Sequence, residues 1–137
     1  MKSDVKAVLR RDLTLAAIML GTGLLGGGIT AVPALPYVAA TIGVLLALSA
    51  YAGEHDLVPG LYPEVVTMAT FVLAFLAGVA FVFLLSSPVD VVAAAALTGG
   101  GVGYGLYRTV FGVIRPVPSY RLDAERGVDP EAPGEDL

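Results

Sequence analysis

The chain has 137 residues, 56% of them hydrophobic, and a mean hydropathy of +0.81. A chain of this length and composition is too apolar for a soluble domain and too short for two membrane domains. It has no cysteine, which excludes disulfides and cysteine nucleophiles. The net charge of −4 with only two lysines is a halophile-like composition, because concentrated salt screens the repulsion between surface acids.

The apolar residues are concentrated in one long interval. No lysine or arginine occurs between Asp12 and Arg108, and this interval holds three apolar runs, residues 13–53, 65–85 and 91–107. The hydrocarbon core of a bilayer is ~30 Å thick and needs about 20 apolar residues for each helical span. We therefore predict an all-α, polytopic integral membrane protein surrounded by the lipid bilayer.

The first run is long enough for two helices. As one helix, residues 13–53 would be ~60 Å long, twice the hydrocarbon thickness. The glycine triplet at 26–28, followed by Pro33 and Pro36, breaks the run, because proline cannot continue a helix and suits a first turn. We predict helices over residues 4–28 and 36–52. The alternative is that residues 20–31 form a re-entrant piece beside three full spans.

The second half of the chain predicts two further helices. Pro63 and Glu64 form a favourable helix start, so a helix is expected over residues 63–85. Ser87 with Asp90 resembles a capping box and predicts a helix over residues 88–114. The four transmembrane helices, packed as two helical hairpins, would form one domain over residues 1–114.

The basic residues predict the orientation in the membrane. They precede the first apolar run or follow the last, at Lys2, Lys6, Arg10, Arg11, Arg108, Arg115, Arg121 and Arg126. Because lysine and arginine are retained on the cytoplasmic side, we expect a cell-membrane protein with both termini cytoplasmic and with Arg108 at the inner boundary. Residues 115–137 are rich in acids and proline and predict a disordered cytoplasmic tail.

Glycine pairs spaced four residues apart predict close helix packing. Such pairs let helix backbones approach in lipid, where van der Waals fit drives association. The contacts could lie within one chain or between two copies, and the remaining alternative is a conduction path along the glycines. The predicted packing residues are Gly23, Gly27, Gly99, Gly101, Gly103 and Gly105.

The sequence Glu54-His55-Asp56 is the one cluster that could bind a metal or move a proton. Adjacent residues seldom converge on one ion, and a structural zinc site needs four ligands. We expect a solvated loop, with a pH-sensitive loop as the alternative, because histidine is the side chain that changes charge near neutrality. We predict no catalytic, cofactor-binding or metal-binding residue.

Two functions compete on this basis. Charged side chains inside the bilayer mark transport or proton relay, and the apolar runs contain none. This pattern favours a non-enzymatic structural, accessory or assembly subunit that packs against a membrane-protein partner or a second copy. The alternative is an oligomeric channel or permease for a small, weakly polar solute, selected by pore width and backbone carbonyls. Neither an enzymatic activity nor a nucleic-acid partner is expected.

Overall fold

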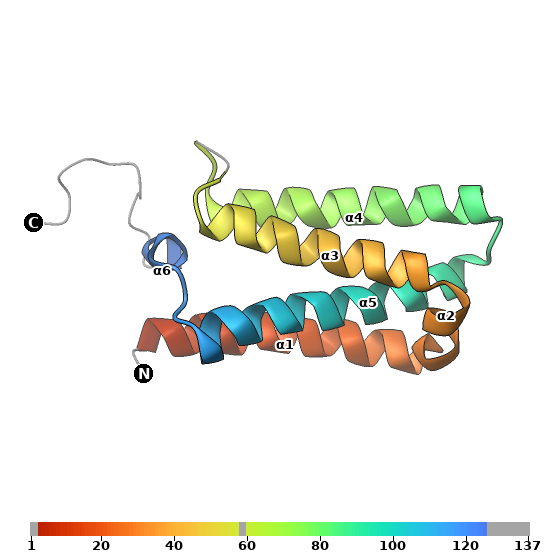
Figure 1. The fold of residues 1–137 in the computed structure, drawn as a ribbon, viewed down its shortest axis with the longest axis horizontal. Coiled ribbons are helices and arrows are strands. Elements are labelled where there is room, and N and C mark those ends of the chain that lie inside the picture. Colours follow the sequence, from red (N-terminus) through yellow and green to blue (C-terminus); the bar gives the residue numbers. More distant parts are fainter. Residues whose placement is uncertain (1–2, 58–59, 126–137) are drawn as a thin grey trace, which may run out of the picture.

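The computed structural model describes residues 3–57 and 60–125, and every regular element in these ranges is a helix (Figure 1). This agrees with the predicted all-α class. The elements in chain order are α1 (Ser3–Leu25), α2 (Gly28–Ala34), α3 (Pro36–Glu54), α4 (Pro63–Leu85), α5 (Val89–Thr109), the π-helical turn η1 (Val110–Ile114) and α6 (Ser119–Glu125).

The glycine triplet breaks the first apolar run earlier than predicted. Helix α1 ends at Leu25 rather than at residue 28, and α2 follows at an angle of 84°. Gly27 lies in the turn with φ of 99°, a left-handed conformation that glycine adopts without steric cost. The described chain therefore has three helices long and apolar enough to cross a membrane, or four if the bent α1–α2 pair forms one span.

Helices α3 and α4 both begin with proline in the first turn, where its missing N–H costs nothing. The bounds of α4 are the same in the structure as in the sequence prediction. Helix α3 continues two residues past the predicted end at residue 52, to Glu54. This extension matters because it places Glu54 on a helix instead of in a loop.

The predicted capping box at the start of α5 is wrong. Pro88 is the residue before the helix, and no side-chain hydrogen bond caps it. The Ser87 hydroxyl donates instead to the Leu85 carbonyl at 3.4 Å. Asp90 lies exposed in the first turn, where its negative charge is favoured by the helix dipole. The helix predicted to reach residue 114 ends at Thr109 and continues as η1.

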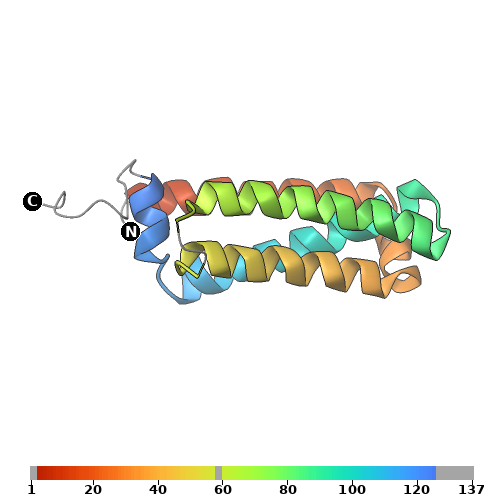
Figure 2. The ribbon, with the colours of Figure 1, turned by 90° about the horizontal axis from the view of Figure 1, so that it is seen from above.

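Helix α5 is the central helix of the bundle (Figures 1 and 2). It packs closely against α1 on one side and α3 on the other, while α4 packs mainly against α3. The predicted packing as two helical hairpins is therefore corrected. Helices α1 and α3 do not pack mainly against each other; each of them packs against α5. Apolar side chains of α1, α3 and α5, including Ala16, Ile42 and Tyr104, share one core cluster.

The predicted disordered tail begins too early. Residues 119–125 form α6, which crosses the end of the bundle and contacts α1, α3 and α4. Val117 and Arg121 are buried there, because this segment folds back onto the helix ends. The rest of the predicted tail, residues 126–137, lies outside the described residues.

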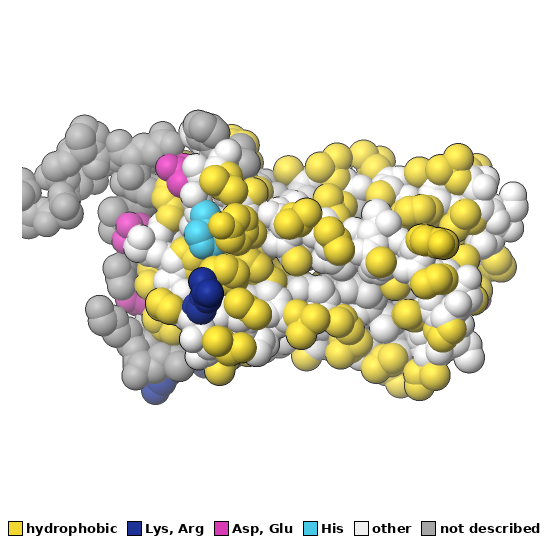
Figure 3. Space-filling model, viewed as in Figure 1, with side chains coloured by type: hydrophobic (Ala, Val, Ile, Leu, Met, Phe, Trp, Pro, Cys, Tyr) yellow, Lys and Arg dark blue, Asp and Glu magenta, His cyan; other side chains and the backbone are white. Residues whose placement is uncertain are grey.

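On the face seen in Figure 3, charged side chains gather at one end of the molecule, while apolar side chains cover the length of the helices. Helix α4 is the most exposed of the long apolar helices. Only 6% of the most apolar part of α4 is buried inside the bundle, against 33% for α3 and 39% for α5 together with η1. An apolar surface of this extent is typical of contact with lipid or with another membrane protein.

Candidate functional site: a buried charge cluster at one end of the bundle

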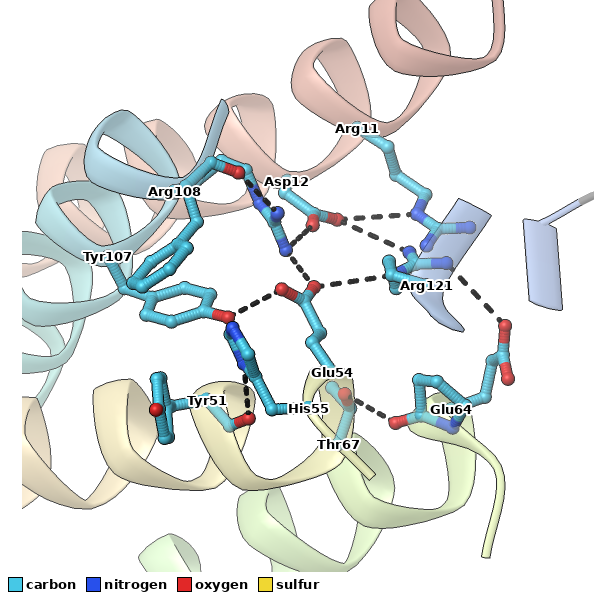
Figure 4. A network of polar contacts seen from close by, with 12 residues as sticks. Arg11, Asp12, Tyr51, Glu54, His55, Glu64, Thr67, Tyr107, Arg108 and Arg121 are labelled. Atoms are coloured by element: carbon cyan, nitrogen blue, oxygen red, sulfur yellow. Dashed lines mark hydrogen bonds and ion pairs between the residues drawn. The ribbon is translucent and has the colours of Figure 1, made fainter. Parts of the chain in front are cut away.

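Four charged side chains from four different helices meet inside the end of the bundle that carries α6 (Figure 4). They are no more than 5% exposed, and Arg108 is fully buried. Burial of unpaired charge is costly, so such residues are buried only with partners. We call this group the end cluster; its members are Asp12 of α1, Glu54 of α3, Arg108 of α5 and Arg121 of α6.

Arg108 is the centre of the end cluster. Its Nη2 atom lies 2.8 Å from Asp12 Oδ2 and also donates to Glu54 Oε1. Its Nη1 atom donates to the Phe111 carbonyl at 3.2 Å. One guanidinium thereby joins α1, α3 and η1, because its planar fork of donors can bond several acceptors at once.

The π-helical turn η1 positions one of these acceptors, the carbonyl of Phe111. Phe111 departs from helical geometry, with φ of −99° and ψ of 47°, and its carbonyl accepts from Arg108. Gly112 follows where a side chain would collide with Leu9 of α1. π-Helical geometry appears mostly as single turns within helices, frequently at functional sites.

Tyr107 completes the coordination of Glu54. Its hydroxyl donates to Glu54 Oε2 at 2.5 Å, while the other carboxylate oxygen faces the two arginines. Hydrogen bonds to an ionised group are roughly twice as strong as those between neutral groups. The carboxylate is therefore held in place from both sides.

Arg121 closes the cluster from α6 with longer contacts. Its Nε atom lies 3.5 Å from Glu54 Oε1, and its Nη2 atom lies 3.9 Å from Asp12 Oδ1. Its Nη1 atom lies 3.6 Å from Glu64, whose side chain is 48% exposed. Because its contacts are longer, Arg121 interacts more weakly with the two buried carboxylates than Arg108 does.

The formal charges of the end cluster balance, with two carboxylates facing two guanidinium groups. A balanced, hydrogen-bonded network is suited to fixing the positions of helices, because removing one member leaves another charge buried and unpaired. The end cluster thus links α1, α3, α5 and α6 through ion pairs. Within residues 3–57 and 60–125, no group of three or more metal-ligating side chains could hold an ion.

The structure separates the three residues of the Glu54-His55-Asp56 sequence. Glu54 belongs to the end cluster, whereas Asp56 is exposed with a positive φ of 53°. His55 is partly buried: its ring stacks on Tyr51 at 4.1 Å between centroids and meets the edge of Phe111 at 5.1 Å. The expectation of a uniformly solvated loop is therefore wrong for Glu54 and His55.

The predicted packing glycines lie at different helix contacts. Side chains at Gly99 and Gly103 would overlap the α3 backbone at Ala39 and Gly43. At the α1–α5 contact, Gly101 of α5 lies against Ala16 and Leu20 of α1. Gly23 of α1 lies against Thr98 of α5, and Gly105 of α5 has ordinary contact with Ala16. Gly27 lies in the α1–α2 turn, where its backbone conformation rather than close helix contact requires glycine.

Sequence reasoning missed the end cluster but contained a signal for it. Asp12 and Glu54 border the two ends of the first apolar run, and Arg108 follows the last run. If consecutive helices alternate in direction and both termini lie on one side, these three residues must lie at the same end. Arg121 carries no such signal, because nothing in its surroundings predicts that α6 folds back.

The helices and their exposed surface define an all-helical protein with several segments compatible with membrane spans. No family model, curated protein or solved structure matches the chain.

Proposed function

We propose that this protein is a small multi-pass protein of the cell membrane that acts as a non-enzymatic accessory or assembly subunit. In this proposal α3, α4, α5 and the bent α1–α2 pair are its four spans. The lengths support this: α5 alone runs about 27 Å from Asp90 to Arg108 at 1.5 Å per residue, close to the ~30 Å hydrocarbon core.

The position of the charges supports a cytoplasmic location for both termini. The described ends of the chain lie at the same end of the bundle, next to the end cluster (Figure 1). The exposed basic residues Lys6, Arg10 and Arg115 belong to segments at that end. The opposite end, formed by α2 and by the α4–α5 turn, has no lysine or arginine in residues 26–36 and 85–90. By the positive-inside rule, the end cluster faces the cytoplasm.

The observation that carries the accessory role is the exposure of α4. This helix lies at the edge of the bundle, and its apolar side chains face outward on most sides, including Met68, Phe75 and Phe83. Between α4 and α5 an apolar groove of about 450 Å³ is lined on one wall by Ala74 and Gly78. A side chain at Gly78 would meet no neighbouring atom, so the glycine leaves room for another helix to approach.

The charged groups support a structural rather than a chemical role. The buried acids and arginines described above are engaged with one another, and their charges balance. The glycines of α5, which the channel hypothesis places along a conduction path, are packed against α1 and α3. The channel alternative therefore gains no support from them, and the proposal rests on a partner helix beside α4.

Affinity purification of the full-length protein from its native membranes, after cross-linking and in mild detergent, tests the proposal. We expect a membrane protein to co-purify in a fixed ratio, and the double substitution Ala74→Leu and Gly78→Leu to reduce its recovery by filling the groove. The matched control is Ala80→Leu, an exposed position of α4 that does not line the groove. Recovery of a lone monomer from native lipid, or equal loss in the control, would contradict the proposed role.

A further inference from the structure

A second apolar groove follows the contact between α3 and α5. It has a volume of about 640 Å³, and none of its described lining residues is charged. The glycines at the α3–α5 contact form its floor, since they bring the two backbones together. Its rims include Val44 and Leu106, whose side chains are 55% and 61% exposed. The view in Figure 3 looks onto this face, where α3 and α5 lie in front.

The groove runs along the bundle from Val32 and Pro36 near the α2 end to Phe111 beside the end cluster. Its wall on α5 and η1, from Thr98 to Val110, is about 18 Å long at 1.5 Å per residue. Half of a hydrocarbon core is ~15 Å thick. This wall is therefore long enough to hold one acyl chain of the leaflet beside the end cluster.

A polar pocket adjoins the groove at its cytoplasmic end. Phe111 lines both the groove and this pocket, which has a volume of about 600 Å³ and also contains His55, Arg115 and Ser119. The Phe111 ring contacts Tyr107 on the groove side, at 5.0 Å between ring centroids, and His55 on the pocket side. The apolar groove thus leads directly to polar side chains and to the cation of Arg115, as in a site for an amphiphile.

Arg115 supplies a cation that is not used elsewhere in the described fold. Its side chain is exposed and makes no ion pair with the residues that the structure describes, unlike Arg108 and Arg121. Two acids also line the pocket, but Glu54 is held by the end cluster, which leaves Asp56 as the exposed one. Guanidinium groups match the geometry of phosphate oxygens, so Arg115 is suited to bind a lipid phosphate.

We propose that this face binds an anionic phospholipid of the cytoplasmic leaflet, with its phosphate at Arg115 and one acyl chain in the α3–α5 groove. This inference rests on the membrane insertion proposed above but is independent of the partner helix at α4. The groove beside α4 does not qualify, because it shares no lining residue with the polar pocket that contains Arg115.

Native mass spectrometry of the detergent-purified, full-length protein with added phosphatidylglycerol tests the site. We expect one lipid to bind more tightly than phosphatidylcholine. Arg115→Gln should weaken this binding about fivefold, the equivalent of one basic residue near an anionic lipid surface. Ala40→Phe, which fills the groove from an exposed position, should weaken it as well.

Matched controls separate the site from general attraction. Arg10→Gln removes another exposed arginine at the same end, and Ala80→Phe adds the same bulk on α4; both should bind lipid as the unmodified protein does. Equal weakening by Arg10→Gln, or no effect of Ala40→Phe, would overturn the proposal. So would equal binding of phosphatidylcholine, or equally tight binding of glycerol phosphate, which has no acyl chain.

The two proposals fail in different ways. If the lipid does not bind as expected but the membrane-protein partner still co-purifies, only the lipid-site inference is contradicted. A protein that is soluble without detergent removes the membrane insertion on which both depend. Circular dichroism and a single size-exclusion peak for each variant show that the comparison is between folded proteins.

Discussion

Substitution of Arg108 by glutamine tests the end cluster most sharply. In the structure this side chain faces both buried carboxylates, Asp12 and Glu54, and is itself fully buried. Without it, the two buried negative charges would face Arg121, whose atoms lie 3.5 to 3.9 Å from them, and the half-exposed Arg11, whose Nε lies 3.5 Å from Asp12 Oδ1. Breaking a buried ion pair in this way costs about 3–5 kcal/mol, so we expect a loss of stability of that size.

The free energy of unfolding can be measured by titration with sodium dodecyl sulfate in mixed micelles, followed by circular dichroism. Arg121→Gln should be less destabilising than Arg108→Gln, because its contacts are longer. Combining Arg108→Gln with Glu54→Gln restores the balance of charge, so the double variant should be more stable than the sum of the two single effects by about 0.5–3 kcal/mol. The control is Arg115→Gln, an exposed arginine without an ion pair in the described chain.

Two results would refute this reasoning. The first is an Arg108→Gln variant as stable as the Arg115→Gln control, because Arg108 would then contribute nothing to the stability of the helix bundle. The second is simple additivity of Arg108→Gln and Glu54→Gln, which would mean that the two residues do not stabilise each other.

The remaining predictions concern helix packing and the cluster's hydrogen bonds, measured by the same titration. Gly103→Ala places a methyl group into the Gly43 backbone and should cost about 1–3 kcal/mol, whereas Gly21→Ala meets open space and should be neutral or stabilise by up to about 1 kcal/mol. Equal effects of the two substitutions would contradict the close α3–α5 packing. Tyr107→Phe removes the hydrogen bond to Glu54 and should cost about 1.5–3 kcal/mol; an unchanged stability would show that the bond contributes nothing.

Local rules in the sequence account well for the helix ends that proline defines. Pro36 and Pro63 begin α3 and α4 where the sequence predicts helices, because a first-turn proline is compatible with a helix and an internal one is not. The same rules fail at α5, where Pro88 rather than Ser87 precedes the helix and has no hydroxyl to cap it. The glycine triplet predicts a break, but the 84° bend depends on how α2 packs against α5.

The end cluster could be predicted only in part, because its residues are far apart in the sequence. Asp12 and Glu54 border the two ends of the first apolar run and Arg108 follows the last, and hydropathy alone treats each residue as the limit of a span. Their burial depends on the central position of α5, which periodicity does not reveal. It also depends on α6, whose short and polar sequence predicts a disordered tail. In the structure Arg121 of this helix pairs with the buried acids.

The central claim, that the chain crosses the membrane with the end cluster on the cytoplasmic side, is most directly tested by cysteine labelling. The chain has no cysteine, so single substitutions can be made without a background: Ser3→Cys and Ser119→Cys at the cluster end, Thr30→Cys and Ser87→Cys at the opposite end. With an impermeant maleimide on intact cells, we predict labelling at positions 30 and 87, and at positions 3 and 119 only after permeabilisation. Labelling of positions 3 and 119 from opposite sides, or a protein released from cells without detergent, would contradict the account.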